Sequence, residues 1–369
     1  MTRNTLTKVA AVHLVAISLL TPATVSLDQI RSDQWHLQYL QVPEAHKHSL
    51  GDDVIVAVVD TGVDPHPDLR SNLLPGIDLT GTTGDGREDT DSHGTGIAGL
   101  VAAHGTGPNS GALGIAPRSK IVPIRARGPI GQGDSDNLAR GIEWALQNDV
   151  RVINASSSGG PSPRLRQAIE AAIQADVVVV AAAGNRPTDL SVTFPAAYEG
   201  VLAVGATDRE GNHAAVSVTG EQVAISAPGV DIYSTSINGK YSKATGTSAA
   251  TAIVAGAAAL VRSRFPGLSA QEVIHRLTAT ATDKGPPGRD EQYGYGVLNI
   301  VAALTADVPP LASAAVSPTV SGSSAVAGPD GRDPGGRGST VVVWVAVLVV
   351  AAAGGVAALL GIRRRRQGG

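Results

Sequence analysis

The chain has 369 residues, of which 43% are hydrophobic, and this is enough to bury the core of one large domain or two small ones. Only 3% of the residues are aromatic and the formal net charge is −3. We therefore expect no nucleic-acid partner, because such partners are held by basic and stacking side chains. Cysteine is absent, which excludes a disulfide framework, a thiolate metal site and a cysteine nucleophile.

The chain begins with a segment typical of a Sec-type signal peptide, residues 1–26. Two basic residues, Arg3 and Lys8, precede an apolar stretch, and small residues follow it. The alternative is an uncleaved membrane anchor. Residues 27–44 come next and are too few to fold as an independent pro-domain. We expect this N-terminal extension to pack along the following domain, with Trp35 as an apolar anchor.

Apolar, β-rich runs alternate with helical patterns between residues 45 and 305. We expect strands at 54–60, 121–125, 150–155, 177–183 and 201–206, and helices near 93–104, 134–148, 163–175, 248–264 and 269–280. Such alternation predicts an α/β fold of three layers, with a mainly parallel sheet and helices on both faces. Uninterrupted apolar runs are typical of strands that are buried on both sides.

Three short motifs in this domain carry an acid, an imidazole and a hydroxyl. Asp60 begins Asp-Thr-Gly at the end of an apolar strand, His93 begins His-Gly-Thr-Gly, and Ser248 ends Gly-Thr-Ser before an alanine-rich helix. A serine hydroxyl becomes a good nucleophile when an imidazole takes its proton, and a carboxylate holds the tautomer of that imidazole. The motifs predict a catalytic triad of Asp60, His93 and Ser248.

Other interpretations of these residue types are weaker. An aspartic protease also uses Asp-Thr-Gly, but it needs two such carboxylates and the chain has one such motif. A serine at a helix start is otherwise an N-cap. Among the other histidines, His66 lies between two prolines and suits a surface turn. His36, His46 and His48 precede the domain, and we expect them to be solvated.

The chain ends with segments that indicate membrane anchoring. Residues 306–340 are rich in Pro, Gly, Ser and Ala and predict a disordered stalk. Residues 341–362 hold no charge and are long enough to cross a hydrocarbon core of about 30 Å as a transmembrane helix. The basic tail, residues 363–369, predicts a cytoplasmic C-terminus. The protein is then a single-pass protein of the cell membrane, with its large domain extracytoplasmic.

With their flanking sequence, these motifs resemble those of the subtilase family. The sequence Val-Ile-Val-Ala-Val-Val-Asp-Thr-Gly-Val lies at 54–63 and Ser-His-Gly-Thr-Gly-Ile-Ala-Gly at 92–99, and the chain order Asp, His, Ser is that of the subtilisin type. The resemblance covers residues 45–305. It implies a subtilisin-like fold and a serine endopeptidase that acts on a polypeptide substrate and needs no cofactor.

The resemblance also implies further site residues. Asn185, in Ala-Ala-Ala-Gly-Asn, stands where the family has a side-chain amide that stabilises the oxyanion. Two segments are implied to line the cleft and its first specificity pocket: Ser156, Ser157, Ser158, Gly159, Ala182, Ala183 and Gly184. The substrate is expected to pair with them through main-chain hydrogen bonds.

Two features depart from, or add to, the family pattern. Subtilases usually follow the serine with Met and place Pro three residues further on, whereas this chain has Ala249 and Ala252. We expect a straighter helix start and free volume beside the nucleophile. The acidic loop at 84–92 admits calcium as an alternative, but it lacks the regular spacing of a calcium loop. We therefore expect a solvated hinge there and no metal.

Several features together resemble the mycosins, membrane-anchored subtilases associated with type VII secretion in actinobacteria. They are Asp-Gln-Trp-His-Leu at 33–37, Tyr-Gly-Tyr-Gly-Val-Leu-Asn from Tyr293, the stalk, the single span and the basic tail. The resemblance implies a protease that processes secreted proteins, with the secretion membrane complex as partner. The alternative is a mainly structural subunit that stabilises this complex, with low or conditional activity. A pseudoprotease would have lost a triad residue, and none is lost.

Overall fold

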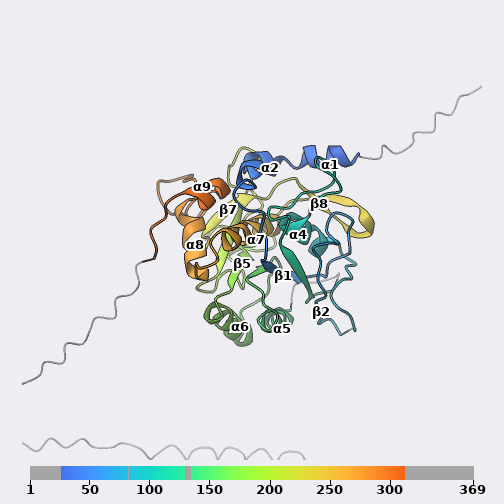
Figure 1. Cartoon of the computed structure of the whole chain (residues 1–369). Helices are drawn as coiled ribbons and strands as arrows, with labels where there is room; N and C mark the ends of the chain where they lie inside the picture. Colours follow the sequence, from blue (N-terminus) through green and yellow to red (C-terminus); the bar gives the residue numbers. More distant parts are fainter. Residues whose placement is uncertain (1–25, 82, 129–133, 312–369) are drawn as a thin grey trace, which may run out of the picture. The chain divides into compact units, whose positions relative to one another are not determined.

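The computed structural model describes residues 26–81, 83–128 and 134–311, all of which belong to one unit (Figure 1). The predicted span at 341–362, the basic tail, most of the stalk and nearly all of the predicted signal peptide lie outside these residues. Within the described ranges, no helix combines the length and the apolar character that a membrane span requires.

Seven parallel strands form the central sheet, in the order β2-β3-β1-β4-β5-β6-β7. Their bounds are β1 Ile55–Asp60, β2 Ile77–Asp78, β3 Lys120–Arg125, β4 Val152–Ala155, β5 Val178–Ala182, β6 Leu202–Thr207 and β7 Ile225–Pro228. Val, Ile and Ala predominate in the central strands because helices cover both faces. In β1, Val56 and Val58 point into one core, while Ala57 and Val59 point into the other.

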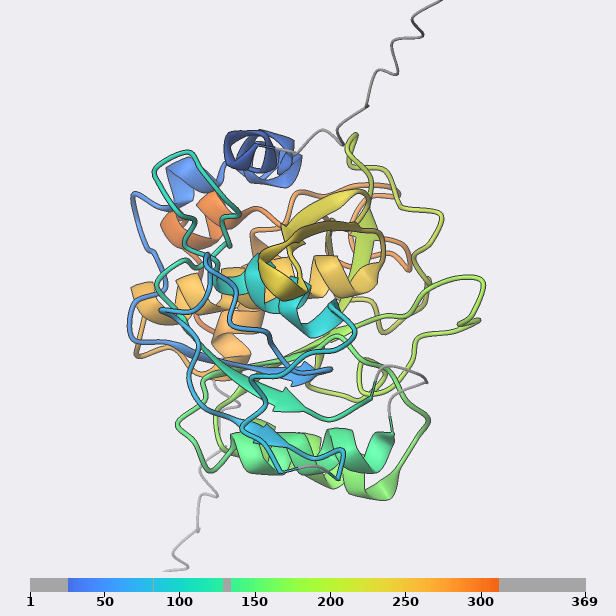
Figure 2. The ribbon, with the colours of Figure 1, turned by 90° about the vertical axis from the view of Figure 1, so that its right-hand side faces the viewer.

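Helices form the two outer layers (Figure 2). Their bounds are α1 Leu27–Asp33, α2 Trp35–Tyr39, α3 Val42–Ala45, α4 His93–Ala102, α5 Ser135–Ala145, α6 Pro163–Gln174, α7 Thr247–Arg264, α8 Ala270–Ala279 and α9 Ile300–Thr305. Helices α5 and α6 cover one face, and α4, α7 and α8 cover the other. The predicted α/β fold, a mainly parallel sheet between two layers of helices, is confirmed.

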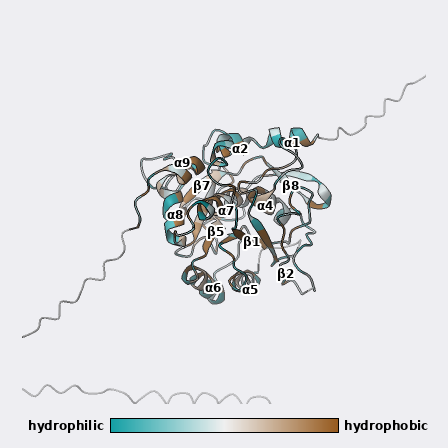
Figure 3. Ribbon diagram, viewed as in Figure 1, coloured by the Kyte–Doolittle hydropathy of each residue, from teal (hydrophilic) through white to brown (hydrophobic). Residues whose placement is uncertain are grey.

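Helix α7 is apolar all round because it lies inside the second layer. Its alanine-rich sequence lets it pack closely against the sheet and α4, and the brown core of Figure 3 includes it. Ala252 is fully buried in the first turns of this helix, which runs from Thr247 to Arg264. Its N-terminus follows a two-stranded antiparallel hairpin, β8 Ile232–Thr235 and β9 Tyr241–Ala244.

All ten predicted elements are present, with ends displaced by up to three residues. The sequence analysis missed β2, β7, the β8–β9 hairpin and the short helices α1, α2, α3 and α9. These elements have two to seven residues, and a hydrophobic period cannot be recognised over so short a run.

The N-terminal extension lies against the domain through polar contacts. Gln34 donates to the carbonyl of Tyr233 (3.2 Å) and accepts from the backbone of Leu113 (2.8 Å), so it joins two distant segments. The indole nitrogen of Trp35 donates to the carbonyl of Val230 at 3.2 Å. These contacts place the extension directly beside the hairpin that leads into α7.

The expectation that the early histidines are solvated is wrong for His36. Its side chain is fully buried, and neither ring nitrogen has a hydrogen-bond partner among the described residues. Burial lowers the pKa of His36 to about 3, so the ring is neutral. His46 is half-buried, with Nε2 at 2.9 Å from the carbonyl of Ile115, and only His48 is exposed. The reason is that the short helix α2 turns this side of the extension toward the core.

His66 is also buried and does not lie in a surface turn. The backbone N–H of Asp68 donates to its Nδ1 at 3.0 Å, and its ring packs edge-on against Tyr241, with 4.9 Å between the ring centroids. The flanking prolines make a tight bend, but the β8–β9 hairpin covers it. His66 is therefore a structural histidine.

Candidate active site

The three motif residues lie at the carboxyl edge of the sheet. Asp60 is the last residue of β1, His93 is the first of α4, and Ser248 is the second of α7. Open parallel sheets place their sites at this edge, because the loops that follow the strands meet there. The fold thus brings Asp60 and Ser248, which are 188 positions apart in the sequence, to the same edge of the sheet.

Asp60 and His93 form a direct hydrogen bond. Nδ1 of His93 lies 2.8 Å from Oδ1 of Asp60, whose side chain is fully buried, while that of His93 is 29% exposed. The N–H of Thr61 also donates to this oxygen, at 2.8 Å. Because the carboxylate can only accept, the imidazole carries its proton on Nδ1 and leaves Nε2 free to act as a base.

Arg127 is a third partner of Asp60, and the sequence analysis missed it. Its Nη2 lies 3.3 Å from Oδ1 of Asp60, the oxygen that His93 also contacts. Burial by itself would raise the pKa of Asp60, but His93, Arg127 and the Thr61 N–H outweigh it and hold this pKa at about 2. The carboxylate is therefore ionised at neutral pH.

The pKa of His93 is raised above its usual 6.5. Burial opposes the charged ring, but the charge of Asp60 and the hydrogen bond to it outweigh burial. Arg127 acts in the opposite sense and lowers this pKa, while Asp91 raises it. The site therefore stabilises the imidazolium that a proton transfer from a hydroxyl would create.

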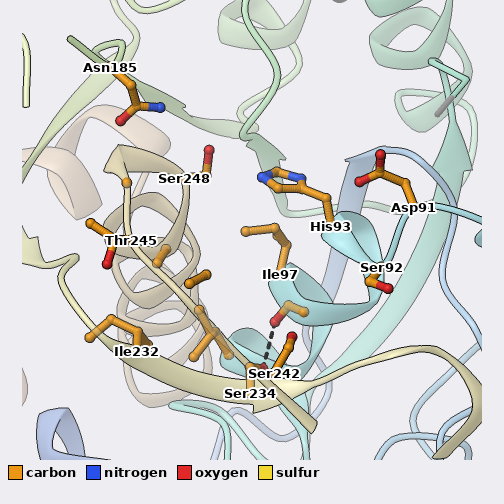
Figure 4. A pocket seen from close by; sticks show the side chains of 15 residues that line it. Asp91, Ser92, His93, Ile97, Asn185, Ile232, Ser234, Ser242, Thr245 and Ser248 are labelled. Carbon is orange, nitrogen blue, oxygen red and sulfur yellow. Dashed lines mark hydrogen bonds between the residues drawn. The ribbon is translucent and has the colours of Figure 1, made fainter. Parts of the chain in front are cut away.

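The hydroxyl of Ser248 faces the same space as the imidazole but bonds elsewhere (Figure 4). It donates to the carbonyl of Ser156 at 3.1 Å, and the hydroxyl of Ser156 donates back to the carbonyl of Ser248 at 3.2 Å. A rotation about the Cα–Cβ bond of Ser248 would turn its oxygen toward His93. Hydrogen bonds between a catalytic hydroxyl and its base are commonly long or poorly aligned until a substrate is bound.

Asn185 lies opposite Ser248 with its amide held in one orientation. Its Oδ1 accepts from the backbone N–H of Thr247 (2.8 Å), which leaves the Nδ2 donor on the side of Ser248 and His93 (Figure 4). Asp189 Oδ2 accepts from the backbone N–H of Asn185 at 2.7 Å. Gly184 precedes Asn185 with φ of 120°, a conformation that favours glycine, and this turn aims the Asn185 side chain.

The seven residues implied to bind substrate are brought to the site to different degrees. Ser156 contacts Ser248 as described above, Ser157 Oγ lies 3.5 Å from Oδ2 of Asp60, and the Gly184 N–H donates to Thr247 Oγ1 at 3.3 Å. Among the described residues, the other four make no hydrogen bond to the triad motifs: Ser158, Gly159, Ala182 and Ala183. Only Ser158 and Gly159 of these seven are more than slightly exposed.

A cavity of about 400 Å³ opens beside Ser248. His93, Asn185 and Ser248 line it together with residues of α4, the β8–β9 hairpin and the start of α7. None of the seven implied substrate residues lines this cavity.

The acidic loop at 84–92 is buried at Gly86 and Asp89, partly exposed at Asp85 and Ser92, and exposed at its other positions. The carboxylate of Asp89 accepts from the Ser92 N–H (3.1 Å) and from the Thr95 N–H (3.0 Å), so it caps the start of α4 and orients His93. The sequence analysis missed this role, although an acidic residue just before a helix is a recognisable signal. Within the described ranges, no cluster of three or more His, Cys, Asp or Glu side chains could hold a metal.

Comparison with known proteins gives one consistent family. The model of the subtilase family matches residues 51–296. Subtilisin Savinase of Lederbergia lenta is 39% identical over 279 residues, which cover 74% of this chain and 99% of that protein. Minor extracellular protease Epr of Bacillus subtilis (strain 168) is 36% identical over 275 residues, and this match covers 74% of the chain and 42% of that protein.

Solved structures include mycosins among the similar folds. The crystal structure of MycP1 from Mycobacterium smegmatis is 31% identical, with a TM-score of 0.69, and the match covers 74% of this chain and 85% of that chain. MycP3 protease from the type VII (ESX-3) secretion system is 34% identical, with a TM-score of 0.65 and coverage of 74% and 88%.

Proposed function

Since the chain belongs to the subtilase family and is a serine endopeptidase related to the mycosins, we propose that Asp60, His93 and Ser248 form its catalytic triad. The observation that carries this assignment is the 2.8 Å hydrogen bond between Asp60 and His93, at a cavity that Ser248 also lines. His93 and Ser248 line this cavity, where substrate can reach the imidazole and the hydroxyl, and Asp60 lies buried behind the imidazole.

In the first step, the Ser248 oxygen attacks the carbonyl carbon of the scissile bond while Nε2 of His93 takes its proton. Asp60 holds the Nδ1–H and stabilises the imidazolium. The oxyanion accepts hydrogen bonds from Nδ2 of Asn185 and from the backbone N–H of Ser248. That N–H has no partner inside the helix because it belongs to the first turn of α7.

The carbon–nitrogen bond then breaks, and His93 gives its proton to the leaving amine. This leaves an ester between Ser248 and the acyl part of the substrate. Water attacks the ester while His93 takes a proton from that water, and His93 then gives this proton to the Ser248 oxygen as the acid departs. The acyl part lies along the segments at 156–159 and 182–184, which we assign to main-chain pairing with the substrate.

A change of Ser248 to Ala tests the triad. Turnover of an unstructured protein substrate should stop, while the far-UV circular dichroism and the thermal midpoint stay those of the wild type. Turnover at the wild-type rate in the folded Ser248→Ala protein would overturn the assignment.

We further assign the protein to the cell membrane as a single-pass, extracytoplasmic protease that processes proteins secreted by a type VII system. The predicted signal peptide and the uncharged residues 341–362 support anchoring, and the likeness to MycP3, a protease from a type VII secretion system, supports the pathway. Cells that express the full chain should hold it in the membrane, and cells that express the chain without residues 341–362 should release it. Retention of the truncated form in the membrane would contradict the anchor.

The second candidate is a mainly structural subunit of the secretion complex, and two observations favour it. The Ser248 hydroxyl bonds to the carbonyl of Ser156, away from His93, and Ala249 takes the place of the Met usual in subtilases. Under this alternative, the Ser248→Ala protein supports secretion as well as the wild type, whereas deletion of the chain abolishes secretion. The processing role predicts that both changes leave the secreted substrate uncut.

A further inference from the structure

The segment that follows β4 contacts two members of the triad. Ser156 contacts Ser248 through the two hydrogen bonds described above, and the next residue, Ser157, has its Oγ 3.5 Å from Oδ2 of Asp60. Strand β4 pairs with β1, which ends at Asp60. The two serines therefore lie between the acid at the end of β1 and the nucleophile at the start of α7, so a shift of this segment would move one relative to the other.

A buried amide holds this segment in place. Asn154, in β4, is fully buried, and its Oδ1 accepts a hydrogen bond from the hydroxyl of Ser156 at 2.9 Å. The same hydroxyl lies 3.2 Å from the carbonyl oxygen of Ser248. Its single proton is thus shared between two acceptors, one in the sheet and one in the first turn of α7. The hydroxyl of Ser156 joins these two elements.

Packing alone does not explain an amide at this position. The residues across from Asn154 in the neighbouring strands are Val58 of β1 and Val180 of β5, and both are fully buried. Among the described residues, Nδ2 of Asn154 is buried without a hydrogen-bond partner. A buried donor without a partner is unfavourable, and an aliphatic side chain of similar size would avoid this cost. The amide therefore has a role that an aliphatic side chain could not fill.

We propose that Asn154 is a positioning residue for the nucleophile and that it acts through Ser156. The proposal rests on the triad assignment above and adds a supporting residue to it. Asn154 fixes the orientation of the Ser156 hydroxyl by accepting its hydrogen bond, and this hydroxyl in turn holds the backbone of Ser248 against β4. When the contact is lost, the start of α7 can move relative to β4, and the Ser248 oxygen is less often within reach of His93.

The rate at which a small fluorophosphonate probe labels the full chain tests this role. Such a probe reports the reactivity of Ser248 and does not depend on main-chain pairing of a peptide with the cleft. Asn154→Leu has a similar size but accepts no hydrogen bond, and we expect it to slow labelling by about tenfold, the effect of losing one hydrogen bond. Ser156→Ala should slow labelling to a similar extent. The double variant should be no slower than the slower single variant, because both changes break the same contact.

Val152→Ala is the matched control for lost stability. Val152 is fully buried in the same strand and on the same face as Asn154, two residues farther from the site. The change leaves a cavity, so the thermal midpoint should fall while the labelling rate stays that of the wild type. A purely structural role of Asn154 would make Asn154→Leu behave as Val152→Ala does.

Labelling of Asn154→Leu at or above the wild-type rate would overturn the inference and leave the triad standing. The inference is also overturned if the two single effects multiply in the double variant, because Asn154 would then act independently of Ser156. Should Asn154→Leu fail to fold, Asn154→Ala, which adds no atoms to the site, takes its place in the same comparison. A folded wild type that the probe does not label at all would overturn the triad assignment itself, and this inference with it.

Discussion

Arg127 and His93 share one oxygen atom of Asp60. Nη2 of Arg127 lies 3.3 Å from Oδ1 of Asp60, and Nδ1 of His93 lies 2.8 Å from the same oxygen. The guanidinium therefore offsets part of the negative charge that stabilises a protonated His93. Arg127 touches neither Ser248 nor the oxyanion donors, so we regard it as a positioning residue that acts through Asp60.

Replacement of Arg127 by Gln should shift the pH profile of kcat/KM to higher pH. His93 must be neutral to accept the Ser248 proton, so activity rises as pH passes through its pKa, which already lies above 6.5. Because Arg127 lowers the pKa of His93, its loss raises that pKa further. Arg127→Lys keeps the charge and should stay close to the wild type. A midpoint that is unchanged or lower in the Gln variant would contradict this role.

Loss of the Asn185 amide donor should slow acylation strongly. We expect Asn185→Ala to lower kcat by about 10²- to 10³-fold with little change in KM, as for other single oxyanion donors. Asn185→Asp is the matched control for folding, because its carboxylate oxygen still accepts from the Thr247 N–H while the donor is gone. The two variants should be similarly slow. Near wild-type kcat in either one would remove Asn185 from the oxyanion site.

His36 should make the folded protein less stable in acid. Its folded pKa of about 3 lies below the usual 6.5, so between these values the unfolded chain binds a proton that the folded chain does not. Above pH 6.5, His36 has no effect on the free energy of unfolding. Below pH 6.5, it lowers this free energy by about 1.4 kcal/mol for each pH unit, until the pH nears 3.

A change of His36 to Leu tests this linkage. The thermal midpoint should fall less steeply between pH 6.5 and 4 in this variant than in the wild type. His48→Leu, at an exposed position, should keep the wild-type slope. Equal slopes in all three proteins would show that His36 does not cause the loss of stability in acid.

The parts of the fold that the sequence predicted are those with a long hydrophobic period or a short motif. The strand that ends at Asp60 and the helix that contains Ser248 have such signals, and the structure brings both to one edge of the sheet. The seven-stranded order and the place of β7 could not be predicted, because a four-residue strand ending in Pro228 has little pattern of its own.

The partners of the site residues were hidden for a different reason. Arg127 lies 67 positions from Asp60, and nothing in its neighbours indicates that β3 pairs with β1 and carries it there. The burial of His36 likewise depends on how α2 lies against the domain. Contacts between segments far apart in the chain arise from tertiary packing, which a single sequence does not display.

The most direct test of the account is covalent labelling of the full chain with a fluorophosphonate probe, followed by mapping of the modified peptide. Such a probe reacts with a serine that is activated by a base and lies beside oxyanion donors. We predict one adduct, on Ser248, which is lost in Ser248→Ala and strongly reduced in His93→Ala. An adduct on another serine, or none on the folded wild type, would contradict the assignment of Asp60, His93 and Ser248 as the catalytic triad.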